Sequence, residues 1–177
     1  NFESEENNVY KLLIVTTLVE TIVELILDLV GPLYKEIPFI SFPVAKIFCA
    51  SITLWNCFLC TYVAIVSIKI KNRKDLLWLK NIDYLIAVIF IILTFVLPLD
   101  FFYDKNVSYV LGSSVNICYV SSTVYTIIAL IYTFWNIKNI KDKRFIPVLF
   151  MMIFGPTIAI VQYFQPGLLL ATAGHVF

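Results

Sequence analysis

The sequence predicts an all-α fold, a polytopic bundle of transmembrane helices with five full spans and the start of a sixth. The chain is 60% hydrophobic and only 14% charged, whereas soluble domains carry roughly a quarter of charged residues. Long, nearly uncharged stretches recur along its 177 residues, and each is too continuous for the short alternating strands of a membrane β-barrel. Helices are favoured because they satisfy their backbone hydrogen bonds internally, as lipid requires.

Charged residues, glycine and proline delimit the first three predicted spans. Span one covers about 10–33 and ends at a Gly-Pro pair. Span two covers about 47–68 and lies between two lysines. Span three covers about 84–99, between Asp83 and Asp100, and ends near Pro98. A helix needs about 20 residues to cross the hydrocarbon, so spans one and two are long enough and span three is short.

The second half of the chain contains the remaining spans. Span four lies within the uncharged stretch 106–137, and the polar Gly112-Ser113-Ser114 cluster is predicted to start it. Span five begins at Ile146-Pro147, because proline is favoured at the first position of a helix, and it ends near 165–167. The sixth span opens at Leu168 and is about half of the length that crosses a bilayer. We therefore expect residues 1–177 to be one membrane domain from a longer chain.

The basic residues of the loops predict the orientation. Nine Lys and Arg residues lie in or beside the connectors 69–80 and 138–144, against three in the other loops. Because basic loops resist translocation, the N-terminus and the loops 71–81 and 138–145 are predicted to be cytoplasmic in a multi-pass cell-membrane protein. The net charge of +1 and the restriction of the cations to two short clusters argue against a nucleic-acid partner.

Three carboxylates lie inside span one. Glu20, Glu24 and Asp28 are spaced four residues apart, which places them along one side of a helix. Each costs about 2.5–3.5 kcal/mol at the bilayer centre, so we expect them to face the bundle interior, to be protonated or to be paired. One interpretation is a proton- or cation-responsive element or a pocket for a ligand headgroup. The other is a structural polar seam, and both stay open.

Two amide side chains complete the set of candidate sensing residues within the membrane. Asn116 lies in span four and Gln162 in span five. Together with Asp28 they are predicted to face the interior and to form the polar centre of the bundle. Such side chains more often join helices through hydrogen bonds than bind ligands. The candidate set is therefore Glu20, Glu24, Asp28, Asn116 and Gln162.

The sequence offers no catalytic, cofactor or metal-binding motif. A phosphate-binding glycine loop, a Ser/His/Asp or Cys/His set and a metal-ligand cluster are all missing from it. Cys57 and Cys60 form a C-x-x-C pair, but the pair lies inside span two and the single histidine is His175. We interpret these thiols as small apolar helix residues, and we expect no cofactor and no metal.

Four short segments, in order along nearly the whole chain, carry a family resemblance. They are Tyr10-Lys11-Leu12-Leu13 with Asp28 in the same helix; Tyr109-x-x-Gly112-x-x-Val115-Asn116-x-x-Tyr119 continuing to Ser122 and Tyr125; Ile146-Pro147; and Gln162-x-x-x-Pro166-x-Leu168-Leu169-Leu170. The chain thereby resembles the N-terminal membrane region of bacterial signalling proteins, mainly from low-GC Gram-positive lineages. In that family a membrane sensor precedes a cytoplasmic histidine kinase or a GGDEF diguanylate cyclase. Glu20 and Glu24 are not part of the resembling pattern.

The resemblance implies a sensory input domain that does not itself catalyse a reaction. Its parent would be a two-component sensor histidine kinase that works as a homodimer and carries its catalytic output domain in the cytoplasm. Its partners would be the lipid bilayer and a small or lipophilic ligand. Two alternatives stay open: the input domain of a diguanylate cyclase, and a small proton-coupled transporter or channel.

Overall fold

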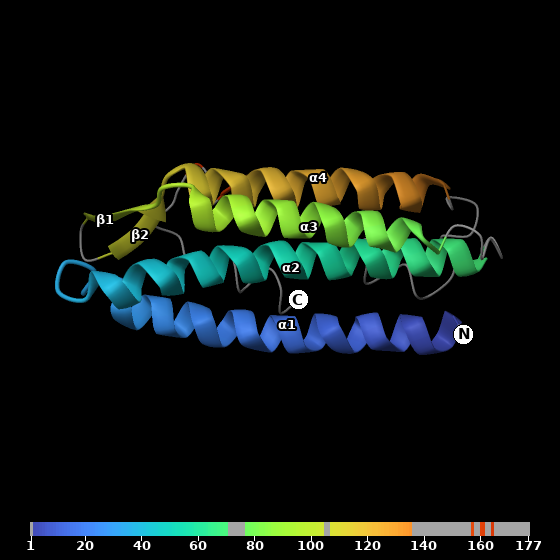
Figure 1. Cartoon of the computed structure of the whole chain (residues 1–177), viewed down its shortest axis with the longest axis horizontal. Helices are drawn as coiled ribbons and strands as arrows, with labels where there is room; N and C mark the ends of the chain where they lie inside the picture. Colours follow the sequence, from blue (N-terminus) through green and yellow to red (C-terminus); the bar gives the residue numbers. More distant parts are fainter. Residues whose placement is uncertain are drawn as a thin grey trace.

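The computed structural model describes residues 2–70, 77–104 and 107–135, together with Thr157, Ile160, Val161 and Phe164. The continuous stretches contain long helices and one hairpin. The elements are α1 (Phe2–Val30), α2 (Pro38–Ile70), α3 (Leu79–Val96), β1 (Asp100–Asp104), β2 (Val107–Leu111) and α4 (Ser113–Trp135). Figure 1 shows the helices side by side, each antiparallel to the one before it.

Three of these helices are long and apolar enough to cross a membrane: α2 over Pro38–Lys69, α3 and α4. They coincide with predicted spans two, three and four, so the prediction of a helical protein compatible with a membrane is confirmed. The prediction of five full spans and a sixth is not supported. Helix α1 is not among the three because its acidic residues and Lys11 leave no long stretch nearly free of charge. Spans five and six lie outside the described stretches.

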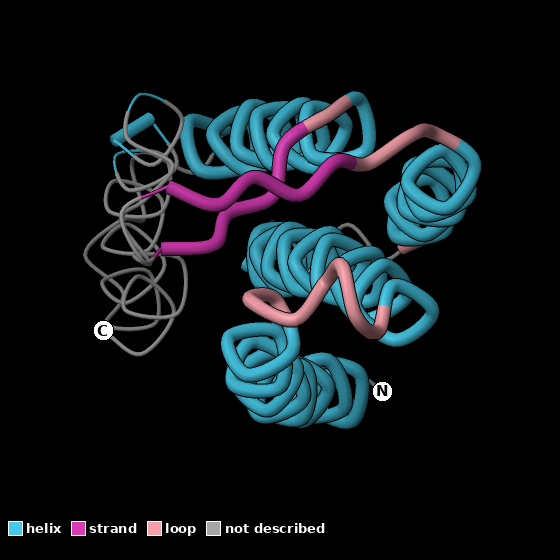
Figure 2. Tube along the Cα trace, turned by 90° about the vertical axis from the view of Figure 1, so that its left-hand side faces the viewer, coloured by secondary structure: helices cyan, strands magenta, loops and turns pink. Residues whose placement is uncertain are grey.

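Helix α2 forms the centre of the bundle. In its most apolar stretch 72% of the residues are buried, compared with 33% for α4 and 17% for α3. Figure 2, seen from the hairpin end, places α2 between α1 on one side and α3 and α4 on the other. The other helices therefore assemble around α2, and each keeps one face on the outside.

The outside of the bundle is apolar. On α3 only Asp83, Ala87 and Thr94 are buried, while large side chains such as Leu85 and Val96 are exposed. Helices α1 and α4 likewise expose many leucines, isoleucines and valines. A water-soluble protein rarely exposes so much contiguous apolar surface, whereas acyl chains solvate it well. The surface therefore agrees with the composition.

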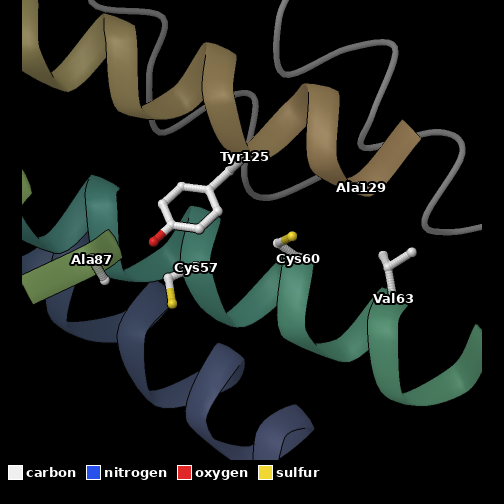
Figure 3. Packing of buried hydrophobic residues seen from close by; sticks show 6 residues of the cluster. All are labelled: Cys57, Cys60, Val63, Ala87, Tyr125 and Ala129. Carbon is white, nitrogen blue, oxygen red and sulfur yellow. The ribbon is translucent and has the colours of Figure 1, made fainter. Parts of the chain in front are cut away.

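Small residues let α2, α3 and α4 approach closely. A buried cluster joins Cys57, Cys60 and Val63 of α2 to Ala87 of α3 and to Tyr125 and Ala129 of α4 (Figure 3). Small side chains are common where transmembrane helices pack, because they bring the backbones together. Tyr125 is the one large member, and its ring fills the space between the three helices.

A β-hairpin, which the sequence did not predict, connects α3 to α4. Strand β1 pairs antiparallel with β2, from Asp100 opposite Leu111 to Asp104 opposite Val107. Its aromatic and β-branched residues favour a strand. Gly112 joins the hairpin to α4 with φ of 117°, a conformation that side-chain-bearing residues rarely adopt.

The hairpin is attached to the end of the bundle by aromatic packing. Phe101 is buried, and its ring stacks on Tyr34 with centroids 5.3 Å apart. Phe42 meets the same ring edge-on at 5.1 Å. Because Tyr34 and Phe42 flank the start of α2, these contacts tie the α1–α2 connection to the α3–α4 connection.

Candidate functional site

A layer of buried and half-buried polar side chains crosses the middle of the bundle, and we call it the central polar layer. Helices α1, α2 and α4 contribute to it from near their midpoints. Its members are Thr17, Glu20, Glu24, Cys49, Thr53, Trp55, Asn56, Cys118, Ser121 and Ser122.

Hydroxyl and amide groups hold α2 against α4 in this layer. The hydroxyl oxygens of Thr53 and Ser121 lie 3.1 Å apart, and both residues are fully buried. One turn further along α2, the Asn56 amide donates a hydrogen bond to the Ser122 hydroxyl at 3.0 Å. Hydrogen bonds of this kind fix the register of two helices that apolar packing alone leaves free to slide.

Two side-chain hydrogen bonds link α1 to α2. The indole N–H of Trp55 donates to the Thr17 hydroxyl at 3.0 Å, and that hydroxyl donates in turn to the carbonyl of Leu13. At the end of α1, the Ser41 hydroxyl donates to the carbonyl of Val30 at 2.9 Å. Helix α1 is thus held to α2 both at its centre and at its C-terminus.

Two of the five predicted sensing residues are buried in the central polar layer. Glu20 is 1% exposed and Glu24 is 8% exposed. Glu20 also lies within electrostatic range of the Cys118 thiol of α4, and that thiol contacts Cys49 of α2. The Glu20 carboxylate is therefore directed into the bundle.

Asp28 does not join them, and the prediction that it faces the interior is wrong. The structure places Asp28 on the outside of the bundle. Successive residues of a helix turn by about 100°, so eight positions carry Asp28 about 80° around the axis from Glu20. The buried side of α1 follows Val9, Thr16, Glu20 and Glu24, and the stripe of carboxylates leaves that side at its last member.

Asn116 is also exposed, so the prediction that it faces the interior is wrong as well. The buried side of α4 follows Ser114, Cys118, Ser121 and Tyr125. A residue two positions from Ser114 and from Cys118 projects from about the opposite side of the helix. Gln162, the fifth predicted residue, lies outside the residues that the structure describes.

Asp83 is a buried acidic residue that the sequence did not single out, since it served there as the boundary of span three. It lies inside α3 and is 2% exposed. Its backbone carbonyl accepts hydrogen bonds from the Tyr125 hydroxyl at 2.7 Å and from the Cys57 thiol at 3.5 Å. The spacing of Asp83, Ala87 and Thr94 would have revealed it, because four and eleven residues return to one face of a helix.

Charged residues gather at the two ends of the bundle. At one end Lys69 of α2 pairs with Glu6 at 2.8 Å, and Lys80 of α3 pairs with Glu5 at 2.9 Å. The start of α1 therefore lies beside the basic connector, as expected if both are on one side of a membrane. That this side is cytoplasmic stays a prediction.

At the opposite end of the bundle, the Lys46 side chain caps the C-terminus of α3. The Lys46 ammonium donates hydrogen bonds to the carbonyls of Phe95 at 2.6 Å and of Leu97 at 2.9 Å. These carbonyls lie at the C-terminus of the helix, where backbone acceptors lack helical partners and the helix dipole favours a positive charge. Lys46 thereby ties α2 to the end of α3.

The chemistry available in the central polar layer is hydrogen bonding and proton binding. Over residues 2–70, 77–104 and 107–135, no group of three His, Cys, Asp or Glu side chains is arranged to hold a metal ion. The four cysteines are buried free thiols. Glu20 and Glu24 are the carboxylates of the layer, so they can bind or release protons there.

No family model matches the chain, and neither the curated proteins nor the solved structures contain a match.

Proposed function

We propose that this chain is the membrane-embedded sensory input domain of a bacterial signal-transduction protein, with a two-component sensor histidine kinase as its parent. The observation that carries the proposal is the burial of Glu20 and Glu24 in the central polar layer. Buried ionisable residues between membrane helices are costly and usually have a functional role. The resemblance of the four sequence segments to such sensors supports the same assignment.

The two carboxylates make the position of α1 sensitive to its environment. Helix α1 carries too much charge to be counted with the three apolar helices, so its place in the bundle depends on the contacts that bury Glu20 and Glu24. A proton or a ligand that binds these groups changes the free energy of those contacts. A difference of about 1–3 kcal/mol between two arrangements is enough to bias a signalling equilibrium.

A shift of α1 has a structural route to the end of the bundle. Trp55 and Ser41 join α1 to α2, and the ion pairs of Glu5 and Glu6 join the first turns of α1 to α3 and α2. These ion pairs lie at the end predicted to face the cytoplasm. An output domain on that side would receive the change.

The test is a fusion of this chain to the cytoplasmic part of a histidine kinase of known output. Glu20→Gln and Glu24→Gln should change reporter phosphorylation about fivefold or more, because each removes a buried ionisable group. Asp28→Asn is the matched control, since the third carboxylate of the stripe is exposed and its loss should leave the output unchanged. Equal effects of all three variants, in fusions shown to be inserted, would contradict the proposal.

A proton-coupled transporter or channel is the second candidate, because the same buried carboxylates could carry protons. In that case the purified chain in liposomes should dissipate an imposed pH gradient, and Glu20→Gln should abolish the flux. The sensory proposal expects no flux and a changed output. If the fusion to a diguanylate cyclase responds to Glu20→Gln and the kinase fusion does not, the parent belongs to the cyclase class.

A further inference from the structure

The thiols of Cys49 and Cys118 contact each other between α2 and α4. The Cys118 side chain forms hydrogen bonds with the side chains of Cys49 and Thr53. Both cysteines are free thiols, and they are 5% and 6% exposed. The contact therefore brings together two thiols that belong to different helices and lie far apart in the sequence.

Hydrogen bonds one turn further along the helices hold the backbones of the two cysteines close together. The Thr53 hydroxyl donates to the carbonyl of Cys49 at 3.1 Å. The Ser121 hydroxyl donates to the carbonyl of Cys118 at 2.8 Å, and the two hydroxyl oxygens are 3.1 Å apart. Because α2 and α4 run in the same direction (Figure 1), each cysteine lies about one turn before this contact. A disulfide needs Cα atoms about 4.4–6.8 Å apart, a separation that only helices in close contact provide.

The C-x-x-C pair of α2 has a different geometry. Cys57 and Cys60 lie three residues apart in one continuous helix, where the Cβ atoms of such residues are about 5–6 Å apart. A disulfide needs about 3.5–4.5 Å between these atoms, so the helix would have to unwind. Figure 3 shows the two sulfur atoms pointing in different directions, and the Cys57 thiol donates to the carbonyl of Asp83 at 3.5 Å. The pair that stands out in the sequence is therefore the less suited to form a disulfide.

We propose that Cys49 and Cys118 are a redox pair, which a hydroperoxide oxidises to a disulfide between α2 and α4. With hydrogen peroxide, the sulfur of one thiol breaks the O–O bond, which gives a sulfenic acid and one water molecule. The sulfur of the second thiol then displaces the hydroxyl group of the sulfenic acid as a second water molecule, and the S–S bond forms. The two sulfur atoms together lose two electrons, which the peroxide oxygens gain, and both thiol protons end in water.

The position of the pair favours a small neutral oxidant. Both residues are more than nine-tenths buried, so a bulky charged disulfide such as oxidised glutathione would have to lose its hydration to reach them. Cys118 lies five residues inside α4, about 7 Å from the start of the helix at the hairpin. The hairpin end is opposite the end predicted to be cytoplasmic, and oxidising conditions are usual outside the cell. The oxidant would therefore enter from the hairpin end, and the site does not depend on the proposed sensory role.

The test treats the full 177-residue chain in lipid nanodiscs with hydrogen peroxide, blocks the remaining thiols and maps the disulfides by mass spectrometry. We expect the free thiols to fall from four to two. One cross-linked pair of peptides should contain Cys49 and Cys118, and dithiothreitol should separate it again. Oxidised glutathione at the same concentration should give no cross-link.

The variant with Cys57→Ser and Cys60→Ser is the matched control, because it also removes buried thiols of α2 and should keep the cross-link. Cys49→Ser and Cys118→Ser should each abolish it. Survival of all four thiols, a cross-link through Cys57 or Cys60, or oxidation without a cross-link would each overturn the redox pair. Equal cross-linking by oxidised glutathione would overturn the hydroperoxide as its oxidant. If a serine variant does not fold, the disulfide map of the wild-type chain decides.

Discussion

Helices α1 and α3 lie on opposite sides of α2, and they differ in the residues that they bury against it. Helix α3 has 18 residues, of which only one side, marked by Asp83, Ala87 and Thr94, is buried. Helix α1 has 29 residues, and its outer side exposes leucines such as Leu18 and Leu29 together with Lys11 and Asp28. Its inner side, however, carries two buried carboxylates. Helix α3 is long and apolar enough to cross a membrane, whereas α1 does not meet this criterion and is packed against α2 (Figure 2).

The difference has an energetic consequence. The buried carboxylates of α1 oppose insertion by about 3 kcal/mol each, and apolar residues favour it by only about 0.3–0.6 kcal/mol each. Contacts with α2 and α4 must therefore supply part of the free energy that keeps α1 in place. An interaction of this kind can respond to protons or ligands, as the proposed sensory role requires.

The largest expected effect concerns insertion of the isolated helices. In a translocon insertion assay, α3 should insert alone and α1 should not. Replacing Glu20 and Glu24 of isolated α1 with leucine should lower its apparent insertion free energy by about 6 kcal/mol. Thr16→Leu with Thr21→Leu is the control and should change it far less. Efficient insertion of unmodified α1 would remove the distinction between the two helices.

The next effect concerns the contact that holds α1. Trp55 is 3% exposed and its indole donates to Thr17. Trp55→Ala should lower the free energy of unfolding by about 3–5 kcal/mol, because it opens a cavity and removes the hydrogen bond. Denaturation in detergent micelles measures this value. Trp78→Ala, at the exposed start of α3, should change it by less than about 0.5 kcal/mol. Equal losses in the two variants would show that α1 is not held at Trp55.

The sequence predicts α2, α3 and α4 well because an apolar run of about 20 residues has few other folds. It does not predict the hairpin, because the residues of β2 are as apolar as those of α4. No charged residue separates the strand from the helix. Periodicity alone cannot separate a short apolar strand from the start of a helix. The polar Gly112-Ser113-Ser114 cluster does predict where α4 begins, but the residues before it do not by themselves predict a strand.

The candidate site shows the same limit at the level of single residues. The cost of a carboxylate in lipid predicts that Glu20 and Glu24 are buried, and both are. The same argument fails for Asp28 and Asn116, because it does not take into account which side of each helix faces its neighbours. It also overlooks Asp83, because a charge near the end of an apolar run was interpreted as a boundary. Only the packing of the helices decides which polar residue faces inward.

The smallest expected effect concerns the direct link between α1 and α3. Lys80 and Glu5 pair at 2.9 Å, with side chains 28% and 33% exposed. A double-mutant cycle with Glu5→Gln and Lys80→Met should give a coupling of about 0.5 kcal/mol at low salt. In 1 M salt the coupling should fall toward zero, because screening then acts over about 3 Å. Such a result would mean that this ion pair orients α1 without holding it, and that the central polar layer carries its attachment. A coupling above about 2 kcal/mol that persists at high salt would instead place the attachment of α1 at the basic end, and the response of the helix to Glu20 and Glu24 would then have to be small.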